Sequence, residues 1–152
     1  MTDENQPFTV FNFQVEIAGQ NGQPLCKAAF AECDGLEMSM ELKTIREGGR
    51  NGAQVRLAGP TAFGTLTLKR GMTRSFDLWD WFADTLRDPG LRAEAEVVML
   101  GSDGHTVQAT FALSRCIPTK VKAPPLNAKD GIVAIEEFQM AYEYLELKKP
   151  RS

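Results

Sequence analysis

The chain has 152 residues, of which 24% are charged and 43% are hydrophobic, and its formal net charge is −3. This length fits one domain, which can bury roughly 70% of the surface of its unfolded chain without disulfides or a metal. The negative net charge argues against a general nucleic-acid binder and against a protein held on anionic membranes. No apolar run approaches the ~18 residues that a membrane span needs.

The first residues, MTDENQPF, are polar and acidic. They do not have the pattern of a secretory signal, so we expect none. Cys26, Cys33 and Cys116 form an odd number without close pairing, which is typical of a reducing compartment. We therefore expect synthesis in a cytoplasm. Because the cysteines have no CxxC spacing, we interpret them as small buried hydrophobic residues and not as zinc ligands.

Three segments in the first third of the chain alternate apolar and polar side chains with the period of two that is typical of β-strands. They are residues 8–17, 25–33 and 36–45. Asn21-Gly22 lies between the first two, and this dipeptide favours a type I′ hairpin turn. Asp34-Gly35 predicts a bend before the third. We expect strands joined by short turns.

Residues 46–60, REGGRNGAQVRLAGP, are rich in glycine and arginine and poor in apolar side chains. Such a segment adds little to a core, so we expect either a loose loop or a projecting arm that meets another molecule. The physical arguments leave both alternatives open: a mobile hairpin on a monomer, or a contact between copies that also use their bare sheet edges.

Residues 64–86 change from a strand to a helix. Leu66 and Leu68 alternate with polar residues until Gly71 permits a sharp change of direction. Ser75 is the expected N-cap, and from Phe76 onward the apolar spacing is helical. The residues predicted to form the core face of this helix are Leu78, Trp79, Trp81, Phe82 and Leu86. Aromatic side chains bury roughly 150–250 Å² each, so we expect the helix to lie on a β-sheet.

The remaining predicted strands cover residues 95–100, 106–113, 116–122 and 132–145. About eight strands and one helix predict an all-β fold with one helix, in which two antiparallel sheets pack as a β-sandwich or barrel. We expect one domain over residues 1–152. Its expected parts are a flexible N-terminus at 1–7, a projecting arm at 46–60 and a tail at 148–152.

The sequence gives no reason to expect an enzyme. Asp77, Asp80 and Asp84 share one helix face and could in principle hold a cation, but a solvated face is the better interpretation. His105 follows a turn glycine and has no identifiable partner for base catalysis. We predict no catalytic residue, no cofactor and no metal.

Five stretches taken together resemble the tail tube proteins of contractile bacteriophage tails and the related inner tube proteins of contractile injection systems. They are FNFQVEI (11–17), CDGLEMSMELKTIREGGRNG (33–52), GTLTLKRGMTRSFDLWDW (64–81), CIPTKVKAPPLNA (116–128) and IVAIEEFQMAYEYL (132–145). The order and spacing of these motifs match that family across nearly the whole chain. Arg50 departs from it, because an acidic residue is common there.

The resemblance implies a structural subunit of a rigid inner tube, with a fold similar to the tube protein of type VI secretion systems. Six copies would form a ring, in which strands of neighbours continue into a closed inner β-barrel around a lumen. Rings would stack through the arm, and the lumen would conduct DNA or a protein cargo when an outer sheath contracts. The implied partners are further copies of the chain, a sheath protein, baseplate or hub proteins and terminator proteins, without membrane insertion.

The implied location is a virion tail or a contractile injection particle, of phage, extracellular or membrane-anchored type. The residues expected at contacts between copies are Arg46, Glu47, Gly48, Gly49, Arg50, Asn51, Gly52, Arg56, Lys69 and Arg70. Two alternatives stay open: a tube initiator next to the baseplate, and a monomeric small-ligand-binding β-barrel.

Overall fold

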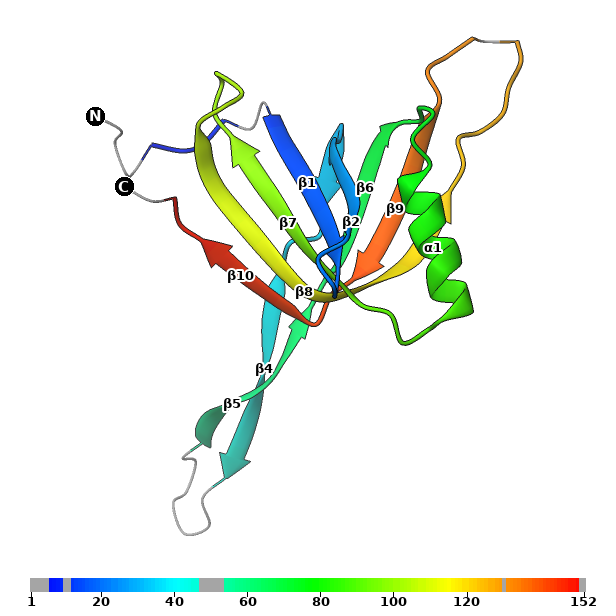
Figure 1. Ribbon diagram of the computed structural model, residues 1–152. Coiled ribbons are helices and arrows are strands. Elements are labelled where there is room, and N and C mark those ends of the chain that lie inside the picture. Colours follow the sequence, from blue (N-terminus) through cyan, green and yellow to red (C-terminus); the bar gives the residue numbers. More distant parts are fainter. Residues whose placement is uncertain (1–5, 10–11, 47–53, 130, 151–152) are drawn as a thin grey trace.

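The structure is a computed structural model that describes residues 6–9, 12–46, 54–129 and 131–150. Within these residues the chain forms ten strands and one helix (Figure 1). In chain order they are β1 (Asn12–Gly19), β2 (Pro24–Ala29), β3 (Glu32–Asp34), β4 (Met38–Arg46), β5 (Gln54–Phe63), β6 (Thr65–Gly71), α1 (Asp77–Arg87), β7 (Ala93–Leu100), β8 (Val107–Lys122), β9 (Ile135–Ala141) and β10 (Tyr144–Lys148).

The strands form two antiparallel layers that share β8. The order along the sheet is β2-β1-β7-β8-β9-β6-β3, and β10 adds to the other side of β8. The first half of β8 pairs with β7 and β10, and its second half pairs with β9. Because β8 bends from one layer into the other, the two layers close over a common core (Figure 1). The predicted fold class, nearly all β with one helix and two packed sheets, is confirmed.

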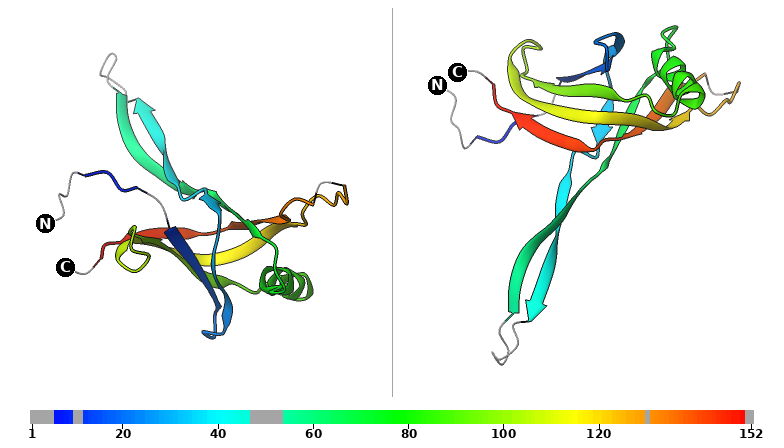
Figure 2. Two further views of the ribbon diagram at one scale, coloured as in Figure 1. Left: turned by 90° about the horizontal axis from the view of Figure 1, so that it is seen from above. Right: turned by 60° about the horizontal axis from the view of Figure 1, so that its bottom comes forward.

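The core consists of the inward side chains of both layers. Val15, Leu66, Leu113 and Met140 are fully buried in it. Helix α1 packs against β8 and β2 and lies beside the sheets in all views (Figures 1 and 2). Its main anchor is Trp81, whose ring centroid is 5.4 Å from that of Phe138 on β9.

The helix differs from the prediction at both ends. It starts after Phe76, which makes no side-chain capping bond, so Ser75 is not the N-cap. Leu78 and Trp81 are buried, whereas Trp79 and Phe82 are half-buried. Leu86 is 72% exposed, so its assignment to the helix core is wrong for the protomer. The buried face of the helix carries residues 78, 81 and 85, and Leu86 lies beyond it.

Four predicted strands are divided differently in the structure. The second becomes β2 and β3, separated at Phe30 and Ala31. The segments 106–113 and 116–122 form one strand, β8, in which Arg115 takes a left-handed backbone conformation (φ 54°). The last strand breaks at Tyr142 and Glu143 into β9 and β10. Period-two alternation finds the strands but not these breaks, because a strand that changes layers keeps its alternation on each side of the bend.

Strands β4 and β5 form a separate two-stranded sheet. We call this β-hairpin, residues 38–46 and 54–63, the arm. It projects away from the two layers in every view (Figures 1 and 2). The arm is therefore longer than the predicted range 46–60, since most of its first strand was expected in the body.

Candidate functional site

The two faces of the arm differ in chemistry. Cross-strand partners in an antiparallel pair lie on one face, and successive partners alternate between faces. The pairs Lys43 with Leu57 and Ile45 with Val55 therefore share one face, and the pairs Thr44 with Arg56 and Arg46 with Gln54 share the other. Ile45, Val55 and Leu57 define what we call the distal apolar face, and they are 48%, 38% and 44% exposed.

The arm exposes further apolar side chains nearer the body. Met38, Met40 and Leu42 are 61%, 54% and 59% exposed. An isolated two-stranded hairpin is marginally stable in water. A hairpin that also exposes apolar side chains along most of its length is typical of a segment that is covered in an assembly.

The base of the arm is fixed by one buried tyrosine. The hydroxyl of Tyr142 lies 2.6 Å from the carbonyl oxygen of Gly35, and it accepts a 3.0 Å hydrogen bond from the backbone N–H of Glu37. The ring of Tyr142 also contacts Phe63 at the end of β5, with 5.9 Å between centroids. One side chain thus holds both chain segments where the arm leaves the body.

Gly35 permits a close approach at the same place. Its φ is +105°, and a Cβ at this position would lie 1.9 Å from the carbonyl oxygen of Thr65. No residue with a side chain fits there without moving the backbone. The direction of the arm is therefore set by a tight contact with β6 and by Tyr142, not by a loose linker.

The predicted contact residues other than Arg70 fall into three groups. Arg46 and Arg56 are exposed on the same face of the arm. The predicted residues from Glu47 to Gly52 lie outside the described residues. Lys69 points away from the core on β6, with its Nζ 3.5 Å from a carboxylate oxygen of Glu32.

Arg70 does not belong to a surface, and its assignment to a contact between copies is corrected. It is 7% exposed. Along β6 it follows the outward Lys69 and shares the inward positions of Leu66 and Leu68, so alternation places its side chain in the core. A buried charge needs partners, and Arg70 has several.

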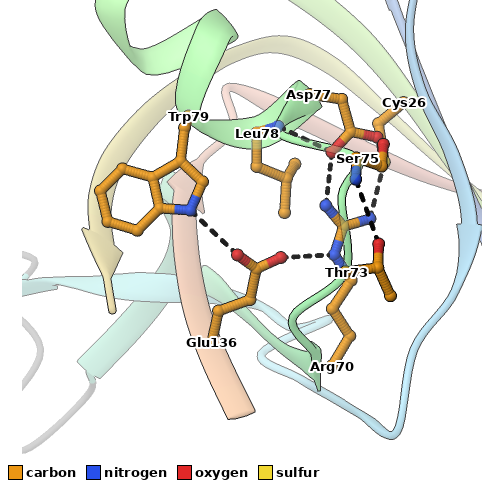
Figure 3. Close-up of polar contacts among 8 residues, drawn as sticks. All are labelled: Cys26, Arg70, Thr73, Ser75, Asp77, Leu78, Trp79 and Glu136. Atoms are coloured by element: carbon orange, nitrogen blue, oxygen red, sulfur yellow. Dashed lines mark hydrogen bonds and ion pairs between the residues drawn. The ribbon is translucent and has the colours of Figure 1, made fainter. Parts of the chain in front are cut away.

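The partners of Arg70 come from β9, α1 and β2, the last through Cys26, whose Sγ lies 3.8 Å from Nη1 of Arg70 (Figure 3). Its Nε donates to Oε1 of Glu136 at 2.7 Å, and its Nη2 donates to Oδ1 of Asp77. The indole Nε1 of Trp79 donates to the other carboxylate oxygen of Glu136 at 2.9 Å. Glu136 is 2% exposed. The cluster therefore ties the start of the helix to the sheet.

The electrostatics of the cluster follow from this geometry. Burial is the largest single effect on the pKa of Asp77 and would raise it. The hydrogen bonds from Arg70, Cys26 and the backbone of Leu78, together with the positive charge of Arg70, outweigh burial and lower the pKa below its ordinary value. Burial, together with the Asp77 carboxylate, raises the pKa of Cys26 to about 12. The thiol therefore stays protonated and unreactive at neutral pH.

Sequence reasoning missed Glu136 and Tyr142. Alternation over 135–141 requires one glutamate of the pair Glu136-Glu137 to point inward, and Arg70 is the only inward cation on the neighbouring described strand β6. This combination is the signal that would have paired them. Tyr142 has no comparable signal, because its partners are backbone groups more than 100 positions away.

Several strand edges have no neighbour within the described chain. Strand β10 pairs only with β8, β2 only with β1, and β3 only with β6. Each leaves a row of backbone N–H and C=O groups on its outer side that another chain can use.

The described residues hold no cluster of three or more His, Cys, Asp or Glu side chains that could bind a metal ion. The helix in the described part of the chain has 11 residues. No helix among the described residues is long and apolar enough to cross a membrane. The functional features of the described residues are the exposed apolar side chains of the arm and the free strand edges.

Comparisons with known proteins agree with this description. Residues 9–146 match the family described as T4-like virus tail tube protein gp19. A chain in the anti-feeding prophage (AFP) baseplate structure is 25% identical with a TM-score of 0.79, covering 95% of this chain and 97% of that chain. No sequence among curated proteins matches.

Two further structures are similar in fold. A chain of the PVC sheath-tube complex, an extracellular contractile injection system in its extended state, is 19% identical with a TM-score of 0.81, covering 97% of this chain and 95% of that chain. Hcp1 from Flavobacterium johnsoniae is 13% identical with a TM-score of 0.51, covering 90% of this chain and 96% of that chain.

Proposed function

The chain belongs to the T4-like virus tail tube protein gp19 family and is a structural subunit of a tube, and from this premise we propose how its copies assemble. Six copies close into a ring by pairing the free strand edges of neighbours. The rings then stack into a tube, and the arm contacts the next ring. The observation that carries this proposal is the arm, a projecting hairpin with exposed apolar side chains and no covering element among the described residues.

The strand edges support ring closure. Strands β2 and β3 are the two ends of the strand order and only two residues separate them along the chain, whereas β10 lies beside β8 in the middle of that order. Each copy therefore offers free edges to two neighbours. A closed ring leaves no bare edge, whereas a monomer exposes all of them. Permanent interfaces of this kind usually bury ~2,000 Å² or more.

The proposed partners outside the tube are a sheath protein, the baseplate or hub, and terminator proteins. A PVC sheath-tube complex and an AFP baseplate are the settings in which the similar chains were solved. We propose that the lumen of the tube conducts DNA or a protein cargo. The chain is made in the bacterial cytoplasm before it joins a virion tail or a contractile injection particle. In this role it works without catalysis.

Electron microscopy of the purified chain, alone and with the baseplate components of its own particle, tests the assembly. Rings and tubes are expected. A chain that stays monomeric at high concentration, both alone and with the baseplate components, contradicts the proposal. Deletion of residues 48–52 should leave a folded protomer that forms rings but does not stack, and tubes of normal length from this variant would contradict the role of the arm.

A tube initiator at the baseplate is the second candidate within the family. It is favoured by one observation, that a chain 25% identical occurs in a baseplate structure. Copy number per particle separates the two roles, because an initiator is present in one or a few rings and the main subunit in many.

A further inference from the structure

A second apolar surface lies in the connection between β8 and β9. In the described part of residues 124–135, which we call the apolar loop, Leu126, Ile132 and Val133 are 93%, 68% and 76% exposed. Together with Pro124 and Pro125 they line an open hollow of about 550 Å³. Monomeric proteins rarely leave such a surface bare unless it binds something.

The apolar loop has a fixed attachment to the body. The backbone N–H of Met72 donates to the carbonyl oxygen of Ala134 at 2.8 Å, and a Cβ on Gly71 would lie 3.9 Å from a methyl group of Val133. The loop therefore presents its apolar side chains from a defined place at the end of β6.

The apolar loop and the arm leave the body in different directions. All three views show them well separated, with the body between their ends (Figures 1 and 2). The arm of one copy cannot reach the loop of the same copy. A contact between them requires two molecules.

We propose that the distal apolar face of the arm, formed by Ile45, Val55 and Leu57, docks into the hollow of the apolar loop of a second copy. The inference rests on the proposed tube function, and it names the surface that receives the arm. A contact between two different patches of identical subunits is heterologous and repeats from copy to copy, as an extended tube requires.

The chemistry of the two surfaces agrees with this pairing. None of the described residues that line the hollow is charged. Arg46 and Arg56 lie on the opposite face of the arm from Ile45 and Val55, so they do not enter the hollow. Lys43 shares the face of Leu57, but it finds no carboxylate in this lining. Apolar side chains therefore carry the contact, and stacking should persist at high salt, where contacts between exposed charges are screened.

Cross-linking between two variants that each add one exposed cysteine tests the contact. Leu57→Cys and Val133→Cys are purified separately, mixed, assembled with the baseplate components and treated with a short bis-maleimide. Covalent dimers are expected from the mixture and not from either variant alone. Cys26 and Cys116 are buried, and burial raises the pKa of both and of the half-buried Cys33 to about 12, so the native thiols react little.

Arg56→Cys is the matched control, because residue 56 lies next to residue 57 but on the other face of the arm. It should give several-fold fewer dimers with Val133→Cys. Equal yields from both arm variants, or no dimers in tubes that do form, would overturn the docking while the tube function stands. Failure of the unmodified chain to form rings or tubes would overturn both.

A charge substitution gives an independent readout. Val133→Glu should shorten or abolish tubes while rings still form. Val107→Glu, at a valine that is 41% exposed at the start of β8, should not. Circular dichroism shows that both variants fold. Normal tubes from Val133→Glu would mean that the apolar loop is covered by another partner or by a neighbour in the same ring, and would overturn the proposal.

Discussion

The guanidinium Nε of Arg70 lies 2.7 Å from a carboxylate oxygen of Glu136, although the two residues are 66 positions apart and the Glu136 side chain is 2% exposed. The pair joins β6 to β9 inside the core. With Asp77 and Trp79 it also joins the sheet to the helix (Figure 3). It is a structural cluster, because its polar atoms satisfy one another.

Arg70→Met should destabilise the protomer by about 3–5 kcal/mol, because it leaves the buried Glu136 carboxylate without its cation. Urea unfolding followed by tryptophan fluorescence measures the change. Lys69→Met is the matched control: its ion pair with Glu32 is exposed, and such pairs contribute about 0–1 kcal/mol. Similar losses from the two variants would contradict the structural role of Arg70.

Asp77 should make the stability of the protomer depend on pH at the acidic end. Its folded-state pKa is lowered, so it contributes stability above the unfolded pKa of ~3.9 and loses it as the pH falls through the folded value. The stability difference between the native chain and Asp77→Asn should be constant above about pH 5 and shrink below about pH 4. Urea unfolding at a series of pH values measures it. A difference that does not change with pH would contradict the ion pair with Arg70.

Sequence patterns predicted the layers of this fold better than its contacts. Alternation located the strands of the two layers because one face of each is buried, and the helix followed from the spacing of Leu78 and Trp81. The same alternation through Leu66 and Leu68 puts Arg70 inside, but Arg70 was assigned together with Lys69 to a contact between copies, and that interpretation was wrong. The predicted arm was too short, because Met38, Met40 and Leu42 alternate like the residues of a core strand. In the protomer these side chains are exposed, and no described element covers them.

Tyr142→Phe should loosen the base of the arm without unfolding the body. The variant removes the hydroxyl that bonds to Gly35 and Glu37, and the loss should be about 1–2 kcal/mol. Hydrogen exchange followed by mass spectrometry should show faster exchange in residues 35–42, with the core of β7 unchanged. Uniform acceleration across the chain would indicate global destabilisation instead.

Gly35→Ala should be much more harmful than Gly22→Ala, although both glycines have positive φ. The backbone strain at either site costs about 1–3 kcal/mol. Only at Gly35 does the added Cβ also meet the carbonyl of Thr65, whereas nothing lies within 4 Å of the corresponding position at Gly22. Thermal unfolding measures the melting temperatures of the two variants. Equal melting temperatures would show that the backbone at the base of the arm moves to admit the Cβ without loss of stability.

Trp81→Ala should destabilise the protomer by about 3–5 kcal/mol, since the side chain is 3% exposed and stacks near Phe138. Leu86→Ala on the same helix removes a side chain that is 72% exposed, and it should change stability by less than about 0.5 kcal/mol. Chemical unfolding of unassembled protein is the proper measurement, because assembly would bury additional surface and mask the difference. If the two variants lost the same stability, the helix would not pack through the face that the structure shows.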